Sequence, residues 1–308
     1  MIAQRAGAHF ASTPRKKIMP TSSPHPGSDR VRLATKLREL RAATGLSGNQ
    51  FAKNLGWPQS RVSKIETAVQ FPTGDDIAGW LAAAGAADQE DSVLELLKRA
   101  RVESVSFRDE FRKPGGAAAK QRSVLELEQR ASRVATFQPA LLPGPVQTPG
   151  FMRELLALPS GPARTGGAAD ADIERMVAVR IERQAQLHDP GKAMPLVIGE
   201  AALWIRVGDL DTQLGQLDRL SSLADLRTVD LRILPFSKAM PIAPLHGFRI
   251  YDAELVVVEL FAGEHLIRDP EEIALYEHMF GTLHAEALSG DAAARLIRSV
   301  SRRLTEDD

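Results

Sequence analysis

The sequence of 308 residues contains no cysteine, which excludes disulfide bonds and thiolate metal sites. It also lacks any apolar run near the roughly 18 residues that a membrane-spanning helix needs. The basic residues near the N-terminus are not followed by the apolar stretch of about 7–15 residues that a secretory signal requires. These absences lead us to expect a cytoplasmic protein.

Motifs of catalysis and metal binding are missing too. The sequence has no H-E-x-x-H, no nucleophile elbow and no Gly-rich phosphate loop. His278 and His284 are six residues apart, which does not place them on one helix face at metal-binding spacing. Glu200 follows an apolar run and is better explained as a helix-capping carboxylate than as a general base. We therefore expect no enzyme, no cofactor and no metal.

Acidic residues are scarce in the N-terminal part of the chain. Residues 1–70 contain only three, Asp29, Glu39 and Glu66, against a clear excess of Lys and Arg. Because the whole chain has 39 basic and 39 acidic residues, the remainder carries the compensating acidic excess. A basic front half joined to an acidic back half suggests a polyanion-binding module attached to a unit of another kind.

Periodicity and composition divide the front of the chain into three segments. Residues 1–29 are rich in proline and small polar residues, which predicts a disordered extension, with Met19 as an alternative start. Residues 30–112 have helical periodicity and predict a helical domain, whose last helix is expected from about Asp88 to Phe111. Residues 113–122, KPGGAAAKQR, predict a linker.

Residues 123–308 predict a second domain of a different class. Helical segments there alternate with short β-like runs, several of them late in the order and joined by short links. This is typical of an α+β domain in which helices pack on a small, partly antiparallel sheet, so the chain is expected to be mainly α. The expected strands are LVIG (196–199), VDLRILPF (229–236), FRIYD (248–252) and LVVVELF (255–261).

Residues 46–66, LSGNQFAKNLGWPQSRVSKIE, predict two short helices packed at a steep angle. Ser47 and Gln50 have the spacing of a capping box for the first helix. Each helix has an apolar pair at helical spacing, a small residue stands where the helices would cross, and a glycine suits a turn that needs positive φ. The apolar pairs are Phe51 and Leu55 on the first helix and Val62 and Ile65 on the second. The small residue is Ala52, the glycine is Gly56, and Trp57 can cover the corner.

Residues 30–66 resemble the phage-repressor-type (XRE) helix-turn-helix family, a five-helix DNA-binding domain, and the resemblance covers about residues 30–85. It implies that the helix over 58–68 enters the major groove of double-stranded DNA. In that family the positions of Gln59, Ser60 and Lys64 reach base edges, since Gln can pair with adenine and Lys with guanine. Further implied contacts are those of Arg61 and Ser63 to bases or phosphates, and of Asn49, Lys53 and Arg32 to the DNA backbone.

The same resemblance implies that Arg41 and Glu66 form a structural ion pair. Two positions depart from the family pattern. Gly48 stands where the family often has a phosphate-binding Gln, and Ala68 stands where it often has Gly. For each exposed polar residue of this helix-turn-helix, a plainly solvated face is the alternative explanation.

The segment VLELEQRASRVATFQPALLPGPVQTPGFMREL resembles the C-terminal domain of an actinobacterial regulator family, the antitoxin-like DUF5753 (Scr1) family. RIERQAQL (180–187), LVIGEAALWIRVG (196–208) and LRILPF (231–236) add to the resemblance, which spans nearly all of 123–305. It implies a regulatory or interaction domain, often beside a small partner protein encoded next to it. Pro145 and Val146 replace the usual Leu-Leu of this family.

The sequence therefore predicts a sequence-specific DNA-binding transcriptional regulator that forms a homodimer and receives a signal through its C-terminal domain. An antitoxin-like protein that sequesters a small partner and a small-molecule sensor remain as alternatives. Arg180 and Arg183 could bind an anionic ligand, although arginine on a long helix is usually solvated or ion-paired. A dimer or partner surface could come from 139–146, from 248–261, or from Phe236, Pro241, Ile242 and Leu245, with core packing as the alternative.

Overall fold

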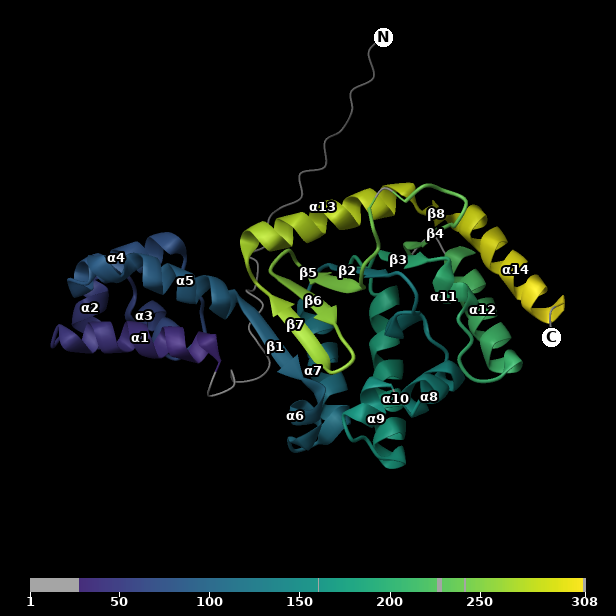
Figure 1. The fold of residues 1–308 in the computed structure, drawn as a ribbon, viewed down its shortest axis with the longest axis horizontal. Coiled ribbons are helices and arrows are strands. Elements are labelled where there is room, and N and C mark those ends of the chain that lie inside the picture. The colour runs from purple at the N-terminus through teal and green to yellow at the C-terminus, as the bar shows by residue number, and fades with distance from the viewer. Residues whose placement is uncertain (1–27, 160, 226–228, 241, 307–308) are drawn as a thin grey trace, which may run out of the picture.

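The computed structural model describes residues 28–159, 161–225, 229–240 and 242–306 of the chain, and the extension expected over 1–29 lies almost entirely outside them. A helical bundle forms the N-terminal part, and a sheet flanked by helices forms the rest, so the expected fold class is confirmed (Figure 1). Within the described ranges no helix is long and apolar enough to cross a membrane. The bundle consists of α1 (Asp29–Ala43), α2 (Gly48–Leu55), α3 (Gln59–Glu66), α4 (Gly74–Ala84) and α5 (Glu90–Arg101).

Local signals set the ends of these helices as the sequence predicts. The Ser47 hydroxyl accepts a hydrogen bond from the Gln50 backbone N–H, and the Gln50 side chain accepts one from the Ser47 backbone N–H, which is the expected capping box. Gly56 ends α2 with φ of 66°, in the left-handed region that glycine tolerates. Thr73 and Asp76 form a second capping box at the start of α4.

The core of the bundle is built around an aromatic side chain from α4. Trp80 is fully buried, its ring centroid lies 5.0 Å from that of Phe51, and its indole N–H donates to the Leu37 carbonyl over 3.0 Å. Trp57 covers the corner between α2 and α3, with its ring 6.2 Å from that of Trp80. The apolar residues predicted from spacing all face this core, and those that are fully buried include Phe51, Ala52, Val62 and Ile65.

The helix expected over 88–111 is wrong in its second half. The helix α5 ends at Arg101, and the chain continues directly as strand β1 (Val102–Ser106), which pairs antiparallel with β7 (Gly263–Ile267). A helical pattern in sequence is overridden here because a sheet edge supplies partners for the backbone N–H and C=O groups. A short helix, α6 (Phe107–Arg112), follows.

The linker expected over 113–122 is mostly helix. Residues from Gly116 onward form the first turns of α7 (Gly116–Arg130), which packs along α10 (Asp170–Gln184). Gly115, with φ of 86°, marks the point where the chain turns into this helix. The run of alanines after the two glycines favours helix, and the apolar contact with α10 outweighs the loop-forming tendency of the glycines.

The second part of the molecule is organised by one mixed sheet of eight strands, in the order β1-β7-β6-β5-β2-β3-β4-β8. The strands β2, β3 and β4 are parallel to one another, and all other neighbours are antiparallel. The remaining strands are β2 (Val134–Gln138), β3 (Leu196–Gly199), β4 (Leu231–Leu234), β5 (Phe248–Tyr251), β6 (Leu255–Glu259) and β8 (Leu288–Ser289).

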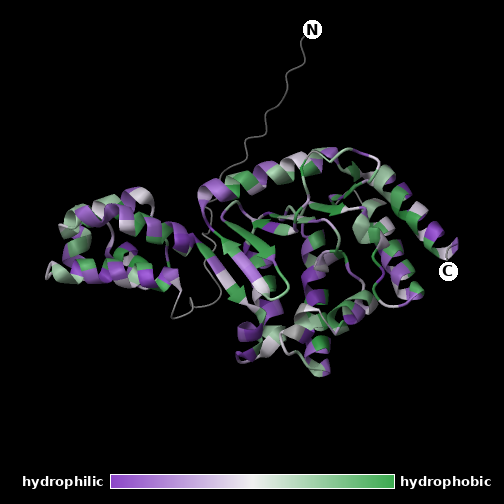
Figure 2. Ribbon diagram, viewed as in Figure 1, coloured by the Kyte–Doolittle hydropathy of each residue, from purple (hydrophilic) through white to green (hydrophobic). Residues whose placement is uncertain are grey.

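Helices cover both faces of this sheet. One face packs on α13 (Pro270–Glu286) through a cluster that includes Phe137, Phe248 and Phe280. The opposite face is covered by helices that include α12 and α14, and its core contains Leu196, Ile198 and Leu217. The strands β3 and β6 are almost wholly apolar, as expected for strands buried on both sides (Figure 2). The other helices are α8 (Pro149–Ala157), α9 (Pro162–Thr165), α11 (Ala201–Trp204), α12 (Leu210–Asp225) and α14 (Gly290–Glu306).

Candidate nucleic-acid interface

The helix α3 is slightly shorter than the segment 58–68 predicted for it. Pro58 is the N-cap residue, with ψ of 138°, so the helix begins at Gln59 and ends at Glu66. Ala68 adopts φ of 55°, and the backbone N–H groups of Val69 and Gln70 donate to the Lys64 carbonyl over 2.8 and 3.0 Å. Ala68 thus takes the left-handed conformation that glycine commonly takes at a helix end.

The two sides of α3 differ sharply in exposure. Val62 and Ile65 are each 1% exposed and pack into the bundle core. Gln59, Ser60 and Lys64 are exposed, so the three residues predicted to reach base edges lie together on the solvent side of the helix. Ser63 is half-buried beside them.

An ion pair ties α3 to α1. The Arg41 Nε lies 2.5 Å from Glu66 Oε1 and its Nη2 lies 3.1 Å from Oε2, while its Nη1 donates to the Leu46 carbonyl over 2.8 Å. The structure therefore contains the ion pair that the family resemblance implies. The hydrogen bonds to Glu66 raise the pKa of Arg41 above its ordinary value. One guanidinium joins α1, α3 and the turn before α2.

A second ion pair, which the sequence did not predict, ties α3 to α4. The Arg61 Nη2 lies 2.7 and 2.9 Å from the two carboxylate oxygens of Asp76. The guanidinium also lies over the Trp57 ring, 4.4 Å from its centroid. Asp76 Oδ2 accepts the Thr73 backbone N–H as well, so one carboxylate caps α4 and holds Arg61. Arg61, predicted to contact bases or phosphates, is engaged inside the protein in this structure.

The residues predicted to contact the DNA backbone lie on two helices. Asn49 and Lys53 are both exposed on α2, four residues apart and therefore on one face. Arg32 lies in the first turn of α1, where its side chain is 68% exposed and pairs with Asp29 over 3.1 Å. Gly48 opens α2 with nothing within 4 Å of the place a Cβ would take, so the missing Gln leaves open surface there.

In the C-terminal part, Glu200, Arg180 and Arg183 all make hydrogen bonds within the protein. Glu200 does not cap a helix as expected, because its Oε2 accepts the Phe236 backbone N–H over 2.7 Å and its Oε1 accepts the Trp204 indole over 3.3 Å. Arg183 makes a buried bidentate pair with Glu128, with distances of 2.8 and 2.6 Å. Arg180 donates to the Gln147 side-chain oxygen over 3.0 Å. Across the described ranges no three His, Cys, Asp or Glu side chains are grouped to hold a metal.

Two family models match the chain. A helix-turn-helix domain matches residues 32–93, and a domain of unknown function (DUF5753) matches residues 121–299. No curated protein matches. One similar solved structure is TrmBL2, described as an archaeal chromatin protein with a novel mode of DNA binding; it is 15% identical over 84% of this chain and 99% of that chain, with a TM-score of 0.28. A TM-score this low does not establish a shared fold.

The two matches coincide with the two parts of the structure. The first covers α1 to the beginning of α5, and the second covers α7 to α14 with all strands except β1. The second match spans more than half of the 308 residues. The chain therefore belongs to the DUF5753 family, here joined to a helix-turn-helix DNA-binding domain.

Proposed function

We propose that this protein is a sequence-specific DNA-binding transcriptional regulator in which α3 enters the major groove of double-stranded DNA. The observation that carries the proposal is the solvent-facing row of Gln59, Ser60 and Lys64 on a helix whose opposite side is buried. A major groove admits one α-helix and presents a distinct donor and acceptor pattern for each base pair. Gln can pair with adenine and Lys with guanine from that position.

Rigid placement of α3 supports this proposal. The pairs Arg41–Glu66 and Arg61–Asp76 hold the helix to α1 and to α4, so its exposed side chains start from a defined orientation. A helix that is already held in place loses less conformational entropy when its side chains bind bases. Lys53 and Asn49 on α2 would then meet phosphates, which orient the protein but carry no sequence information.

A titration of DNA binding tests the proposal. The full chain is titrated into a fluorescent duplex taken from upstream of its own gene and into a scrambled duplex, at several salt concentrations. We expect the upstream duplex to bind more tightly by a factor of about 10³ or more, with both affinities falling as salt rises. Folded protein that binds neither duplex at low salt would exclude the proposal.

We propose further that the C-terminal part forms a homodimer, because two half-sites bound together multiply specificity. Supporting residues lie in the loop between β4 and β5, where Phe236 is 66% and Leu245 is 84% exposed. Ile242 of the same loop packs on the core instead, and Pro241 lies outside the described residues. Of the segment 139–146, Leu142, Pro145 and Val146 are buried and serve the core.

Sedimentation of the full chain tests the dimer. Leu245→Ser is expected to lower the dimer fraction, whereas Ile181→Ser, an exposed apolar residue of α10, serves as the matched control. An unchanged dimer fraction in Leu245→Ser would reject this surface.

A small protein encoded beside the gene could occupy the same surface, which co-expression with the full chain and co-purification would show. The role that we propose for this protein is binding of DNA and of a protein partner in the cytoplasm, and not catalysis.

A further inference from the structure

The two edges of the sheet differ in length. One edge is β8, which has two residues, and the other is β1, which has five. Figure 1 shows β1 at the end of the sheet that lies next to the helix-turn-helix. Edge strands of natural proteins are commonly very short or carry Pro or Lys, which prevents pairing with another chain. The sequence of β1, VESVS, has none of these protections.

The backbone of β1 uses only half of its hydrogen-bonding groups on β7. The Arg101 carbonyl accepts the Arg268 N–H over 2.8 Å, and the Phe107 N–H donates to the Ala262 carbonyl over 2.9 Å. Because the direction of these groups alternates along an antiparallel ladder, the odd-numbered residues of this segment face β7 and the even-numbered ones face the open edge. Among the described residues, none makes a hydrogen bond to the backbone of Ser104. Its N–H and C=O are directed outward.

Free space lies along this open edge. A hollow of about 300 Å³ is lined by Val102, Glu103 and Ser104 of β1, by the end of α5 and by the start of α1. Successive residues of a strand point to opposite faces, so a hollow that touches three in a row lies at the edge and not on one face. Val102 is 38% exposed, and Ser104 is exposed as well.

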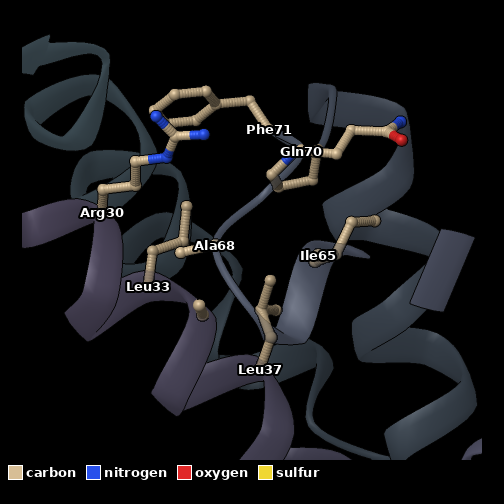
Figure 3. A pocket seen from close by; sticks show the side chains of 9 residues that line it. Arg30, Leu33, Leu37, Ile65, Ala68, Gln70 and Phe71 are labelled. Carbon is tan, nitrogen blue, oxygen red and sulfur yellow. The ribbon is translucent and has the colours of Figure 1, made fainter. Parts of the chain in front are cut away.

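The wall of the hollow that α1 forms is fixed in place. Arg30, in the first turn of α1, is 4% exposed, and its guanidinium lies 4.5 Å from the centroid of the Phe71 ring (Figure 3). Its Nη2 donates to the Val69 carbonyl over 3.3 Å. Asp29 pairs with Arg99 of α5 over 3.4 Å. The hollow is therefore preformed, which lowers the entropy cost of binding there.

We propose that β1 pairs with β1 of a second copy of this chain in antiparallel orientation, with Ser104 opposite Ser104 of that copy. Each Ser104 donates its N–H to the carbonyl of the other, and Val102 lies opposite Ser106 of the second copy. The hollow beside residues 102–104 then receives residues 104–106 of the second copy. A strand that adds to a sheet edge gains affinity from these main-chain hydrogen bonds.

Charge and overlap select this register. Since the outward-facing residues must pair with one another, the two-fold axis can pass beside Glu103, Ser104 or Val105. An axis beside Glu103 sets the two Glu103 carboxylates opposite each other, which is destabilising. An axis beside Val105 leaves Val102 outside the paired strands. An axis beside Ser104 sets Glu103 opposite Val105 and gives all five residues a partner.

The charges at the two ends of β1 favour a second copy as the occupant. The last turn of α5 carries Lys98 and Arg99, and the first turn of α6 carries Asp109 and Glu110. Lys98, Arg99 and Asp109 are exposed. In an antiparallel pair the end of α5 in one copy lies beside the start of α6 in the other, so opposite charges meet at both ends. A two-fold axis repeats each such contact, which makes the surface self-complementary.

This pairing would fix the relative position of two helix-turn-helix units, because α5 runs directly into β1. Two recognition helices held at one distance require DNA half-sites at one spacing. That consequence rests on the function proposed above, whereas the pairing itself does not. The edge of β1 is also separate from the loop between β4 and β5, so the chain would have two self-complementary surfaces.

The absence of cysteine from the chain allows a direct test by cross-linking. The full chain with Ser104→Cys is exposed to oxidised glutathione without DNA, and disulfide-linked dimer is measured on non-reducing gels. A hydrogen-bonded antiparallel pair has Cα atoms about 5.5 Å apart, which suits a disulfide. We expect cross-linking at least about ten times faster than in Ser92→Cys, an exposed position of α5. Equal rates would leave the edge to a strand of another protein and overturn the proposal.

A mixture of two variants tests the register. Val102→Cys and Ser106→Cys should cross-link to each other faster than either does to itself, because these positions lie opposite each other. Faster cross-linking of Val102→Cys to itself would overturn the register centred on Ser104.

A lysine variant covers the case in which Ser104→Cys does not fold. Ser104→Lys sets two ammonium groups opposite each other, so in the Leu245→Ser chain it should raise the dimer dissociation constant several-fold, whereas Ser92→Lys should not. Sedimentation measures this constant. An unchanged constant would overturn the proposal, and so would a wholly monomeric Leu245→Ser chain. Cross-linking of Ser104→Cys should persist with Leu245→Ser, which separates this surface from the loop; its loss would also overturn the pairing of β1.

Discussion

Two arginines that hold α3 and two arginines near the connection between the bundle and the sheet, Arg30 and Arg268, have different partners. Arg41 and Arg61 each have a carboxylate within 3 Å, Glu66 and Asp76. Arg268 Nη1 lies 4.0 Å from Glu103 Oε2, and among the described residues the buried Nη1 atoms of Arg30 and Arg268 have no hydrogen-bond partner. The paired arginines tie α3 to α1 and to α4, whereas no hydrogen bond from Arg30 or Arg268 to a carboxylate is present among the described residues.

This difference predicts opposite responses to mutation. Breaking a satisfied pair leaves a charge stranded, which is strongly destabilising. Removing an arginine that was never satisfied also removes its desolvation cost and its repulsion with a neighbour, so little stability is lost.

Glu66→Ala tests the satisfied side of the comparison. It leaves Arg41 partly buried with only the Leu46 carbonyl, and should lower the free energy of unfolding by about 2–3 kcal/mol. Glu39→Ala, an exposed residue of α1, should change it by less than about 0.5 kcal/mol. Urea unfolding measures both. Equal effects would show that the pair does not hold α3 in place.

Lys64→Ala tests whether the held helix reads bases. Loss of a base contact should cost about 1–3 kcal/mol of discrimination between the preferred duplex and one changed at a single position. Lys53→Ala on α2 should instead weaken all duplexes alike and reduce the salt slope by about one. Competition titrations with a panel of duplexes measure both quantities. A uniform loss in Lys64→Ala would assign that residue to the backbone.

Arg268→Met tests the unsatisfied side. Its free energy of unfolding should stay within about 1 kcal/mol of the unaltered chain, or rise, because a buried donor without a partner is removed. Arg41→Met is the matched change at a paired arginine and should destabilise by about 2 kcal/mol. Urea unfolding is the measurement. A loss of more than about 2 kcal/mol in Arg268→Met would show that Arg268 stabilises the fold as much as a paired arginine does.

The smallest effect is expected from a titrating side chain away from both regions. His246 Nε2 lies 2.9 Å from the Tyr276 hydroxyl, and burial lowers the pKa of His246 below its ordinary value. The unfolded chain therefore binds a proton more readily than the folded one. Stability from this group is present above pH of about 6.5 and declines as pH falls below it.

Urea midpoints from pH 8 to pH 5 measure this effect. His246→Asn should flatten part of the decline, and His278→Asn, at an exposed position of α13, should not. A decline that is identical in all three proteins would show that burial of His246 contributes nothing.

Local rules predicted the helix-turn-helix well because its signals lie close in sequence. The Ser47–Gln50 box, the positive φ of Gly56 and the buried faces of α2 and α3 involve residues at most four apart. The exposure of Gln59, Ser60 and Lys64 follows from the same periodicity. The match of 32–93 to a helix-turn-helix domain agrees with this reasoning.

Long-range pairing explains what local rules missed. Arg61 finds Asp76 fifteen residues later, and the strand β1 finds β7 more than 150 residues later. No spacing rule links such positions, and β1 also lies between the two segments matched by family models. In the second part the sequence predicted β3, β4, β5 and β6 but not β2, β7 or β8. It did not predict the strand order, because strand order depends on which edges meet in the folded chain.

The sequence by itself determined the helices of the helix-turn-helix, the strands β3 to β6 and which side of α3 stays in water, because these follow from apolar periodicity and short-range hydrogen bonds. Only the tertiary structure decided that Arg61 holds α3 to α4 and that Arg268 lies 4.0 Å from Glu103 without a hydrogen bond to it. Charges distant in sequence acquire partners, or fail to acquire them, only when the backbone has brought their helices and strands together.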